Sequence, residues 1–473
     1  MCARGIKLNV DLRCTLCGSE KKPFPPVARC DKCGGILDYV YDYLEIKLPY
    51  SDRRGMWRYR PILPPISEEN IVSMGEGGTP LREAKELAEA MGGGKVLLKD
   101  ETANPTNSYR DRAASLIVSN ALDVGAKKLI CASYGNFGAS AAAYCAKAKI
   151  KCTIITPRNV NVSKLAQMYI YGGHIVRSGD VIDDAIAEAE RAADGYYQAT
   201  PELNPLSVEA QKTISHEVLE ACRNVDVIIV PTGTGNTAYS IWKGVKECLT
   251  LGVVDHIPRM VLVQPDGCAT LINEGGKVRV RRVEKPATAA SPLVSLMPAY
   301  GLLAARAVEE SGGFIVTVTD REIIEAEKLL AKAEGIFSEP ASAASVACLR
   351  KMKDEGFIDH SEVAVCLITA SGLKDPYIID ALADGGRRGV KSRGGFKTKF
   401  EILRFLEIGE SYGYEIWKSI GKRLSIQAVY QHLGELQERG LIEEYYRGRR
   451  KYFKLTQRGR RVLRALEEVS LIF

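Results

Sequence analysis

Two pairs of cysteines near the start of the chain have the spacing of metal ligands. Cys14 and Cys17 form one Cys-x-x-Cys pair, and Cys30 and Cys33 form a second pair after twelve intervening residues. Four thiolates in this arrangement suit tetrahedral Zn²⁺. Each pair runs into a glycine-bearing turn, which lets backbone amides approach the sulfurs. We therefore expect one structural zinc ion; the alternative is four unliganded buried cysteines.

Two glycine-containing loops follow apolar runs and lead into helical patterns. Residues 231–237 read Pro-Thr-Gly-Thr-Gly-Asn-Thr, and residues 132–138 read Ala-Ser-Tyr-Gly-Asn-Phe-Gly. A strand, a glycine loop and a helix start make an anion cradle, because the loop amides are free and the helix dipole is positive there. Asn136 in the second loop is poised to donate a hydrogen bond into the cleft; its alternative role is to cap the following helix.

The positive charge of the chain is concentrated near its C-terminal end. Residues 387–473 contain 20 Lys and Arg against 10 Asp and Glu, whereas the remaining residues contain 45 and 48. A tail of net charge +10 on a nearly neutral body indicates a polyanionic partner. The alternative is a solvated cationic surface.

The segments that would position these residues alternate between β-branched runs and alanine-rich helices such as residues 139–148 and 183–193. This alternation predicts parallel α/β sheets that are covered on both faces and bind ligands beyond the carboxyl ends of their strands. The predicted strands are residues 95–99, 129–133, 152–156, 225–230, 260–264 and 363–369.

The composition fits a cytoplasmic protein of several domains. No apolar run approaches the ~20 residues that cross a bilayer. Nine of the 13 cysteines are scattered singly, unlike a secreted disulfide framework. We expect a zinc ribbon over residues 1–45, an α/β core over 46–384, a flexible linker rich in glycine and arginine over 385–396, and a separate domain over 397–473.

Eight short motifs occur in the order in which one known family carries them. They are residues 57–59, 75–81, 99–101, 104–106, 211–213, 334–337, 339–344 and 372–375. Through these motifs the chain, from the ribbon to about residue 380, resembles threonine synthase, a fold-type II pyridoxal-phosphate (PLP) enzyme. The resemblance implies a tryptophan synthase β-like core and a homodimer.

The resemblance also implies which residues would face the cofactor. By position, Asn136 would face the phenolic oxygen of PLP, and Thr369 would bond its pyridine nitrogen. The residues that would hold its phosphate are Gly233, Thr234, Gly235, Asn236 and Thr237.

One departure from the family concerns the lysine that anchors the cofactor. The family's loop reads Asn-Pro-Thr-Gly-Ser-Phe-Lys-Asp-Arg, whereas residues 104–112 read Asn-Pro-Thr-Asn-Ser-Tyr-Arg-Asp-Arg. Arg110 therefore stands where the Schiff-base lysine belongs. That lysine must act as a neutral amine and then move protons. A guanidinium has a pKa above ~12 and does neither. We expect no intact catalytic residue, and any PLP to bind non-covalently.

A second departure concerns the grip on the substrate's phosphate. The family uses polar side chains from an Asn-Ser-x-Asn-Pro-Tyr-Arg segment and from the residue after the cofactor-facing asparagine. Here the arginine has become Ser207, the serine has become Glu202, and the residue after Asn136 is Phe137. A carboxylate repels a phosphate, so O-phosphohomoserine is not the expected ligand.

The C-terminal segment has the element order of a winged helix: three helices, a hairpin and a final helix. It resembles the PadR-like regulators at residues 413–416, 429–433, 436–442 and 452–459. The resemblance implies that helix 425–439 enters the major groove of DNA, where Gln427 and Gln431 reach base edges. The wing residues that would meet the backbone or the minor groove are Arg447, Arg449, Arg450 and Lys451. The alternative is a winged helix used for protein contact.

Three functions are compatible with this sequence. The leading hypothesis is a regulator that binds double-stranded DNA and whose former enzyme domain senses PLP, a PLP–amino-acid adduct or a free amino acid. The second is an active PLP enzyme, either threonine synthase or a related amino-acid lyase or synthase. The third is a non-catalytic partner subunit of an active paralogue.

Overall fold

The computed structural model describes residues 10–43, 46, 53–158, 160, 162–375, 395–420, 425–448 and 450–463. The chain divides into two compact units, Met1–Ala383 and Asp384–Phe473. Within the described ranges, no helix is long and apolar enough to cross a membrane. Residues 385–394 of the predicted linker lie outside them.

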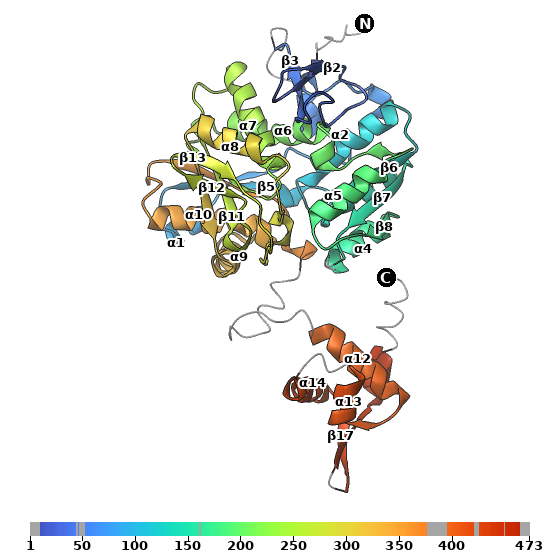
Figure 1. Ribbon diagram of the computed structural model, residues 1–473. Coiled ribbons are helices and arrows are strands. Elements are labelled where there is room, and N and C mark those ends of the chain that lie inside the picture. The colour runs from blue at the N-terminus through green and yellow to red at the C-terminus, as the bar shows by residue number, and fades with distance from the viewer. Residues whose placement is uncertain are drawn as a thin grey trace. The chain divides into compact units, whose positions relative to one another are not determined.

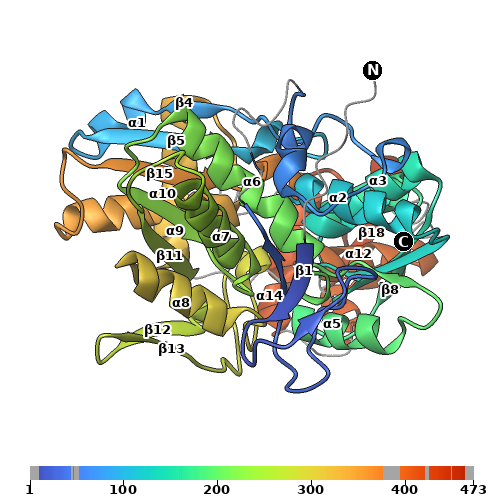
Figure 2. The same ribbon diagram turned by 90° about the horizontal axis from the view of Figure 1, so that it is seen from above.

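The N-terminal ribbon is a small antiparallel sheet that docks on two helices of the core (Figure 1). Its strands are β1 (Val10–Cys14), β2 (Glu20–Lys21) and β3 (Leu37–Tyr41), in the order β2-β1-β3. The two helices, α6 (Leu206–Ala221) and α7 (Asn236–Thr250), lie side by side (Figure 2). Lys243 of α7 forms a buried ion pair with Asp38 of β3, at 2.8 Å. The ribbon is thus tied to the core by charge as well as by apolar packing.

The larger sheet of the core has six strands in the order β14-β11-β10-β15-β5-β4, and only β4 is antiparallel to its neighbour. Residues of β10 and β15 are buried along their whole length, as expected for parallel strands covered on both faces. The strands are β4 (Leu81–Glu83), β5 (Lys95–Asp100), β10 (Val227–Pro231), β11 (Arg259–Pro265), β14 (Phe314–Val318) and β15 (Val363–Ile368).

Helices cover both faces of this sheet and bury its apolar side chains. On one face lie α1 (Lys85–Ala90), α9 (Asp320–Glu334) and α10 (Pro340–Asp354). On the other lie α6, α7 and α8 (Gly301–Ser311), with the hairpin of β12 (Leu271–Glu274) and β13 (Lys277–Val280) beside them.

The smaller sheet is fully parallel and has the order β8-β7-β6-β9. Helix α3 (Asn136–Ala148) packs on it together with α2 (Arg110–Asp123), and α5 (Ile182–Arg191) packs on its strands in a separate apolar cluster. Helix α4 (Val162–Ile170) lies beside α3 and β8. The strands are β6 (Lys128–Ala132), β7 (Lys151–Thr156), β8 (His174–Arg177) and β9 (Tyr197–Gln198). All six predicted strands are therefore present, and the predicted α/β fold class is confirmed.

The C-terminal unit has the predicted order of a winged helix. Its helices are α12 (Gly395–Ile408), α13 (Gly413–Ser419) and α14 (Ile426–Glu438), and residues 457–463 are helical as well. Strands β17 (Ile442–Arg447) and β18 (Arg450–Leu455) form the hairpin, and β16 (Ser411–Tyr412) pairs with β18. Leucine and isoleucine side chains from these helices and strands form one apolar core.

A buried ion network fixes the start of α2 to the rest of the core. Arg112 is fully buried and binds Glu101 at 2.7 Å and Glu217 at 2.6 Å, and Lys99 binds Glu217 at 2.5 Å. Burial raises the pKa of Glu217, but Arg112 and Lys99 outweigh it and lower that pKa from 4.5 to about 2. The stabilisation from Glu217 is therefore complete above pH ~4.5 and is lost as the pH falls towards ~2.

We predict that Arg112→Met destabilises the protein by ~3–5 kcal/mol, because it leaves Glu101 and Glu217 buried with too little positive charge. Chemical denaturation at neutral pH measures this loss. The matched control is Arg82→Met: Arg82 pairs with Asp100 at 3.1 Å, but its side chain is 55% exposed, so we expect a loss below about 1 kcal/mol. Equal losses in both variants would contradict the structural role of the network.

Candidate functional site

A cavity lies at the carboxyl ends of parallel strands from both core sheets, where this architecture places ligands. Its wall includes residues that follow β6, β10 and β15 and the first residues of α2, α3 and α7. Arg110, Asn136, Thr369 and residues 233–235 all line it, although they are far apart in the sequence. The structure therefore brings these residues to one place.

The loop between β10 and α7 packs closely against the backbone of Leu293 and Tyr300. A Cβ at Gly233 would lie 3.1 Å from the backbone of the 290–300 segment, and one at Gly235, whose φ is +84°, would lie 3.0 Å from it. Both glycines are thus required by a close backbone approach. Asn236 turns its side chain into the protein, where Gln211 donates a hydrogen bond to its Oδ1 over 2.8 Å.

Arg110 lines the cavity from the first turn of α2. Its guanidinium carbon lies 4.7 Å from the ring centre of Tyr109. The hydroxyl of Tyr109 in turn shares a hydrogen bond of 2.8 Å with Thr237, which also lines the cavity. Nη1 of Arg110 is buried and has no hydrogen-bond partner among the residues that the structure describes. Because a buried donor without a partner is costly, this nitrogen favours an anionic ligand.

Glu202 brings a carboxylate to the glycine loop. It lines the cavity, and the hydroxyl of Thr234 donates to its Oε1 over 2.9 Å. Thr234 is one of the residues expected to hold the phosphate of PLP. Its hydroxyl is instead hydrogen-bonded to the carboxylate of Glu202. Phe137 also lines the cavity, whereas Ser207 is buried outside it and donates to the carbonyl of Pro201 over 2.6 Å.

A second carboxylate in the cavity belongs to Glu339, at the start of α10. It accepts a hydrogen bond from Nδ2 of Asn136 at 2.9 Å, and Nζ of Lys164 lies 3.5 Å from it and 3.1 Å from Asp375. Burial lowers the pKa of Lys164, but Glu339 and Asp375 outweigh it and raise that pKa, so the side chain is an ammonium. With Nδ2 engaged, Asn136 keeps a buried Oδ1 that has no partner in the described part of the chain.

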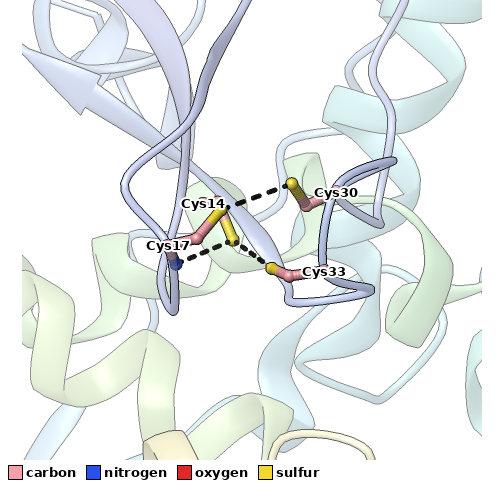
Figure 3. A group of neighbouring side chains, drawn as sticks. All are labelled: Cys14, Cys17, Cys30 and Cys33. Carbon is pink, nitrogen blue, oxygen red and sulfur yellow. Dashed lines mark hydrogen bonds between the residues drawn. The ribbon is translucent and has the colours of Figure 1, made fainter.

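The four ribbon cysteines converge in space (Figure 3). Their sulfur atoms all lie within 4.8 Å of one another, with 3.4 Å between those of Cys14 and Cys33. Burial raises the pKa of the Cys14 thiol, but the N–H groups of Cys17 and Leu16 donate to its sulfur and lower that pKa to about 6. A thiolate is the form that binds metal, so this donor set fits tetrahedral Zn²⁺.

The exposed face of α14 carries the two predicted base-reading side chains. Ser425 caps the helix by accepting a hydrogen bond from the N–H of Ala428, as predicted. Gln427 and Gln431 are both exposed, and Gln431 donates to Glu435 on the next turn over 3.2 Å. The buried face of the helix consists of Val429, Leu433 and Leu436.

The wing carries exposed positive charge at the end of the hairpin. The side chain of Arg447 is 74% exposed and lies 3.9 Å from the carboxylate of Glu410, and Lys451 forms a closer ion pair of 2.8 Å with Glu444. Arg449 lies outside the described residues, as does the side chain of Arg450, which begins β18.

Family models match both units of the chain. The model of pyridoxal-phosphate dependent enzymes matches residues 72–370, and that of PadR-like transcriptional regulators matches residues 402–465. Among solved structures, maize serine racemase has a TM-score of 0.56 at 22% identity, covering 65% of this chain and 92% of its own. Threonine deaminase isoform 2 from Solanum lycopersicum has a TM-score of 0.57 at 19% identity, covering 72% and 98%. The fold and the cavity define a fold-type II PLP-enzyme domain joined to a PadR-like winged helix.

Sequence comparison narrows this class. The threonine synthase of Methanocaldococcus jannaschii is 38% identical over 377 residues, which are 77% of this chain and 93% of the relative. That of Methanosarcina acetivorans is 36% identical over 378 residues, 78% of this chain and 93% of the relative. The chain therefore belongs to the threonine synthase family.

The cavity fits the family's cofactor only in part. The glycine loop before α7 leads into a helix start, as an anion cradle does, and Thr369 lines the cavity. Three side chains do not fit PLP as the family holds it. Arg110 cannot form a Schiff base, and Glu202 engages the hydroxyl of Thr234. Asn136 has only its Oδ1 acceptor left, whereas the phenolic oxygen that the resemblance assigns to it would need a donor.

For the ribbon, we predict that Cys14→Ser removes the zinc and lowers the thermal stability of the protein. A sheet this small has almost no core of its own without a metal. Metal analysis of freshly prepared, unchelated protein should find one zinc per chain in the wild type. The matched control is Cys222→Ser, at a partly exposed cysteine outside the ribbon, which should keep the metal. Wild-type protein without zinc would overturn the assignment.

Proposed function

We propose that this protein is a transcriptional regulator that binds double-stranded DNA, and that its threonine-synthase-like domain senses a small molecule instead of making threonine. The candidate ligands are PLP, a PLP–amino-acid adduct and a free amino acid. The observation that carries the proposal is the side chain at position 110. Arg110 lines the cavity from the start of α2, where the family places its lysine.

The chemistry of arginine supports the loss of catalysis. A guanidinium stays protonated and is not a nucleophile, so it neither anchors PLP nor moves protons at the substrate carbon. General base catalysis alone contributes about 10²–10⁴ in rate, and the covalent route is lost as well. Lys164, in the same cavity, is held as an ammonium between Glu339 and Asp375 and is not an available amine.

The composition of the winged helix supports DNA binding. Gln427 and Gln431 are exposed on the helix that would enter the major groove, and Arg447 is exposed on the wing. The net charge of +10 over residues 387–473 supplies attraction to phosphates. If the core dimerises as its relatives do, two winged helices would bind a two-fold symmetric site.

The second candidate function is catalysis by an altered route. The extent of the sequence similarity supports this candidate, because the chain matches 93% of the length of a threonine synthase at 38% identity. The third candidate function is that of a non-catalytic partner subunit. In that case the winged helix would contact another protein instead of DNA. The two experiments below separate the three.

We predict that the purified protein forms no threonine from O-phosphohomoserine with PLP present. Arg110→Lys alone should not restore full activity, because Glu202 and Phe137 still face the cavity where the substrate's phosphate would lie. Adding Glu202→Ser to Arg110→Lys should raise any turnover above that of Arg110→Lys. The readout is threonine released per enzyme. Robust turnover by the wild type would favour the second candidate.

We predict that the intact protein binds duplex DNA with a steep salt dependence and that a truncation at Gly385 does not. Changing Arg447, Arg449 and Arg450 together to Ala should lower the log–log salt slope by about 0.9 for each lost phosphate contact. Gln427→Ala or Gln431→Ala should instead change sequence preference, by about 1–3 kcal/mol at one base pair.

The control for the wing variant is a triple Ala change at exposed basic residues of the larger unit, Arg321, Lys332 and Arg350. It should leave DNA binding unchanged. If the intact protein binds duplex no better than the truncation at low salt, the winged helix is a protein-contact module and the third candidate takes the lead.

A further inference from the structure

Two side chains in the cavity carry charges that no described residue of opposite charge pairs with. Arg110 forms no ion pair with any described carboxylate, and its Nη1 is buried without a hydrogen-bond partner. Glu202 is 5% exposed and, among described residues, receives one hydrogen bond, from Thr234, and no cation. By contrast, Glu339 in the same cavity is matched by Lys164.

Uncompensated charges of opposite sign in one cavity favour a ligand that carries both charges. Removing a lone charge from water is costly unless a partner and hydrogen bonds replace the water. A guanidinium recognises a carboxylate with two parallel N–H donors, and a carboxylate recognises an ammonium. Arg110 and Glu202 together therefore fit a zwitterion.

Asn136 adds an independent observation that points to the same chemistry. Its Nδ2 donates to Glu339, so the orientation of the amide is fixed by its partner. Its Oδ1 is then an acceptor, buried and without a donor in the described part of the chain. An ammonium supplies such a donor, whereas a phenolate oxygen does not.

The position of Glu202 also argues against a phosphate at the glycine loop. The hydroxyl of Thr234 is engaged by the Glu202 carboxylate at 2.9 Å. The glycine loop that leads into α7 therefore already holds an anion of the protein. A phosphate at the same loop would lie beside a like charge in a buried site, where repulsion is weakly screened.

We propose that the cavity binds a free α-amino acid directly, without PLP, with its carboxylate on Arg110 and its ammonium on Glu202 and Oδ1 of Asn136. The wall also includes the apolar side chains of Phe137, Ile182 and Leu293. Its other two charged residues, Lys164 and Glu339, are paired with each other, so we expect the side chain of the ligand to be uncharged. This inference rests on the proposed function, since it names the ligand that the same cavity senses.

The test is calorimetric titration of the full-length protein, without DNA, using L-valine and L-threonine as probes. We expect both to bind, and L-aspartate, L-lysine and inorganic phosphate to bind at least about tenfold more weakly. Isobutylamine and 3-methylbutanoate each keep only one of the two charged groups of L-valine. Both should bind at least about tenfold more weakly than L-valine. PLP should bind more weakly than the amino acids, and Glu202→Ser should increase the affinity for PLP.

Variants separate the roles of the two charges. Arg110→Met and Glu202→Gln should each weaken L-valine binding by at least about tenfold. Arg350→Met and Glu355→Gln, at exposed positions near the other end of α10 from Glu339, should not. Thermal unfolding verifies that each variant is folded. A second set of variants, Arg110→Lys and Glu202→Asp, keeps the charges and should retain part of the affinity.

The inference is overturned if wild-type protein binds PLP or phosphate more tightly than any amino acid, or if no amino acid binds at millimolar concentration. It is also overturned if Glu202→Gln leaves the affinity for L-valine unchanged. Protein that binds DNA but no amino acid contradicts this inference alone. Protein that binds L-valine as expected but not DNA contradicts the regulator and leaves the amino-acid site standing.

Discussion

The buried guanidinium of Arg112 holds the part of the molecule on which its chemistry depends. Its hydrogen bonds to Glu101 and Glu217 join the start of α2 to the end of β5 and to α6. Asp111, between Arg112 and Arg110, accepts hydrogen bonds from the backbone and hydroxyl of Thr106. The first turn of α2 is thus fixed on two sides. Arg110 is consequently presented to the cavity by a turn that hydrogen bonds hold on both sides.

In that turn, the exchange of one side chain changes what the cavity can do. A neutral amine attacks an aldehyde, whereas a guanidinium binds an anion through fixed donors. Two further contacts in the cavity are consistent with a binding role. The carboxylate of Glu202 accepts a hydrogen bond from Thr234 of the glycine loop, and Asn136 donates a hydrogen bond to Glu339. These contacts are the ones on which the proposed change from catalysis to ligand binding rests. A PadR-like unit is present in the same chain, as the proposed regulator requires.

Much of the fold was predictable because its signals are local. Continuous apolar runs marked β10 and β15, and Ser425 marked the start of α14. Strands β8 and β9 were missed because their residues are only half-buried or exposed, so neither run reads as an apolar strand. β14 was missed for a similar reason, since Phe314, Val316 and Thr317 are only partly buried.

The site was predictable in outline but not in its details. The motifs gave the cavity's loops, yet the inward turn of Asn236 depends on Gln211, which is 25 residues away. Lys164 escaped notice because it lies in a segment without a strand pattern or a quoted motif, and only tertiary packing brings it to Glu339. The pairing of Lys451 with Glu444 likewise follows from the register of the hairpin rather than from charge counts. Electrostatic partners are set by folding, whereas sequence patterns report only which residues are buried.

The central claim is that no lysine of this protein anchors PLP in the cavity. Its most direct test is an absorbance spectrum of the purified protein with PLP, before and after borohydride reduction, with mass mapping of the labelled lysines. The threonine synthase of Methanocaldococcus jannaschii serves as the comparison. We predict no reducible aldimine band at one equivalent of PLP and no stoichiometric label on any cavity lysine. A stoichiometric reducible band, with the label on Lys164 or another cavity lysine, would contradict the account.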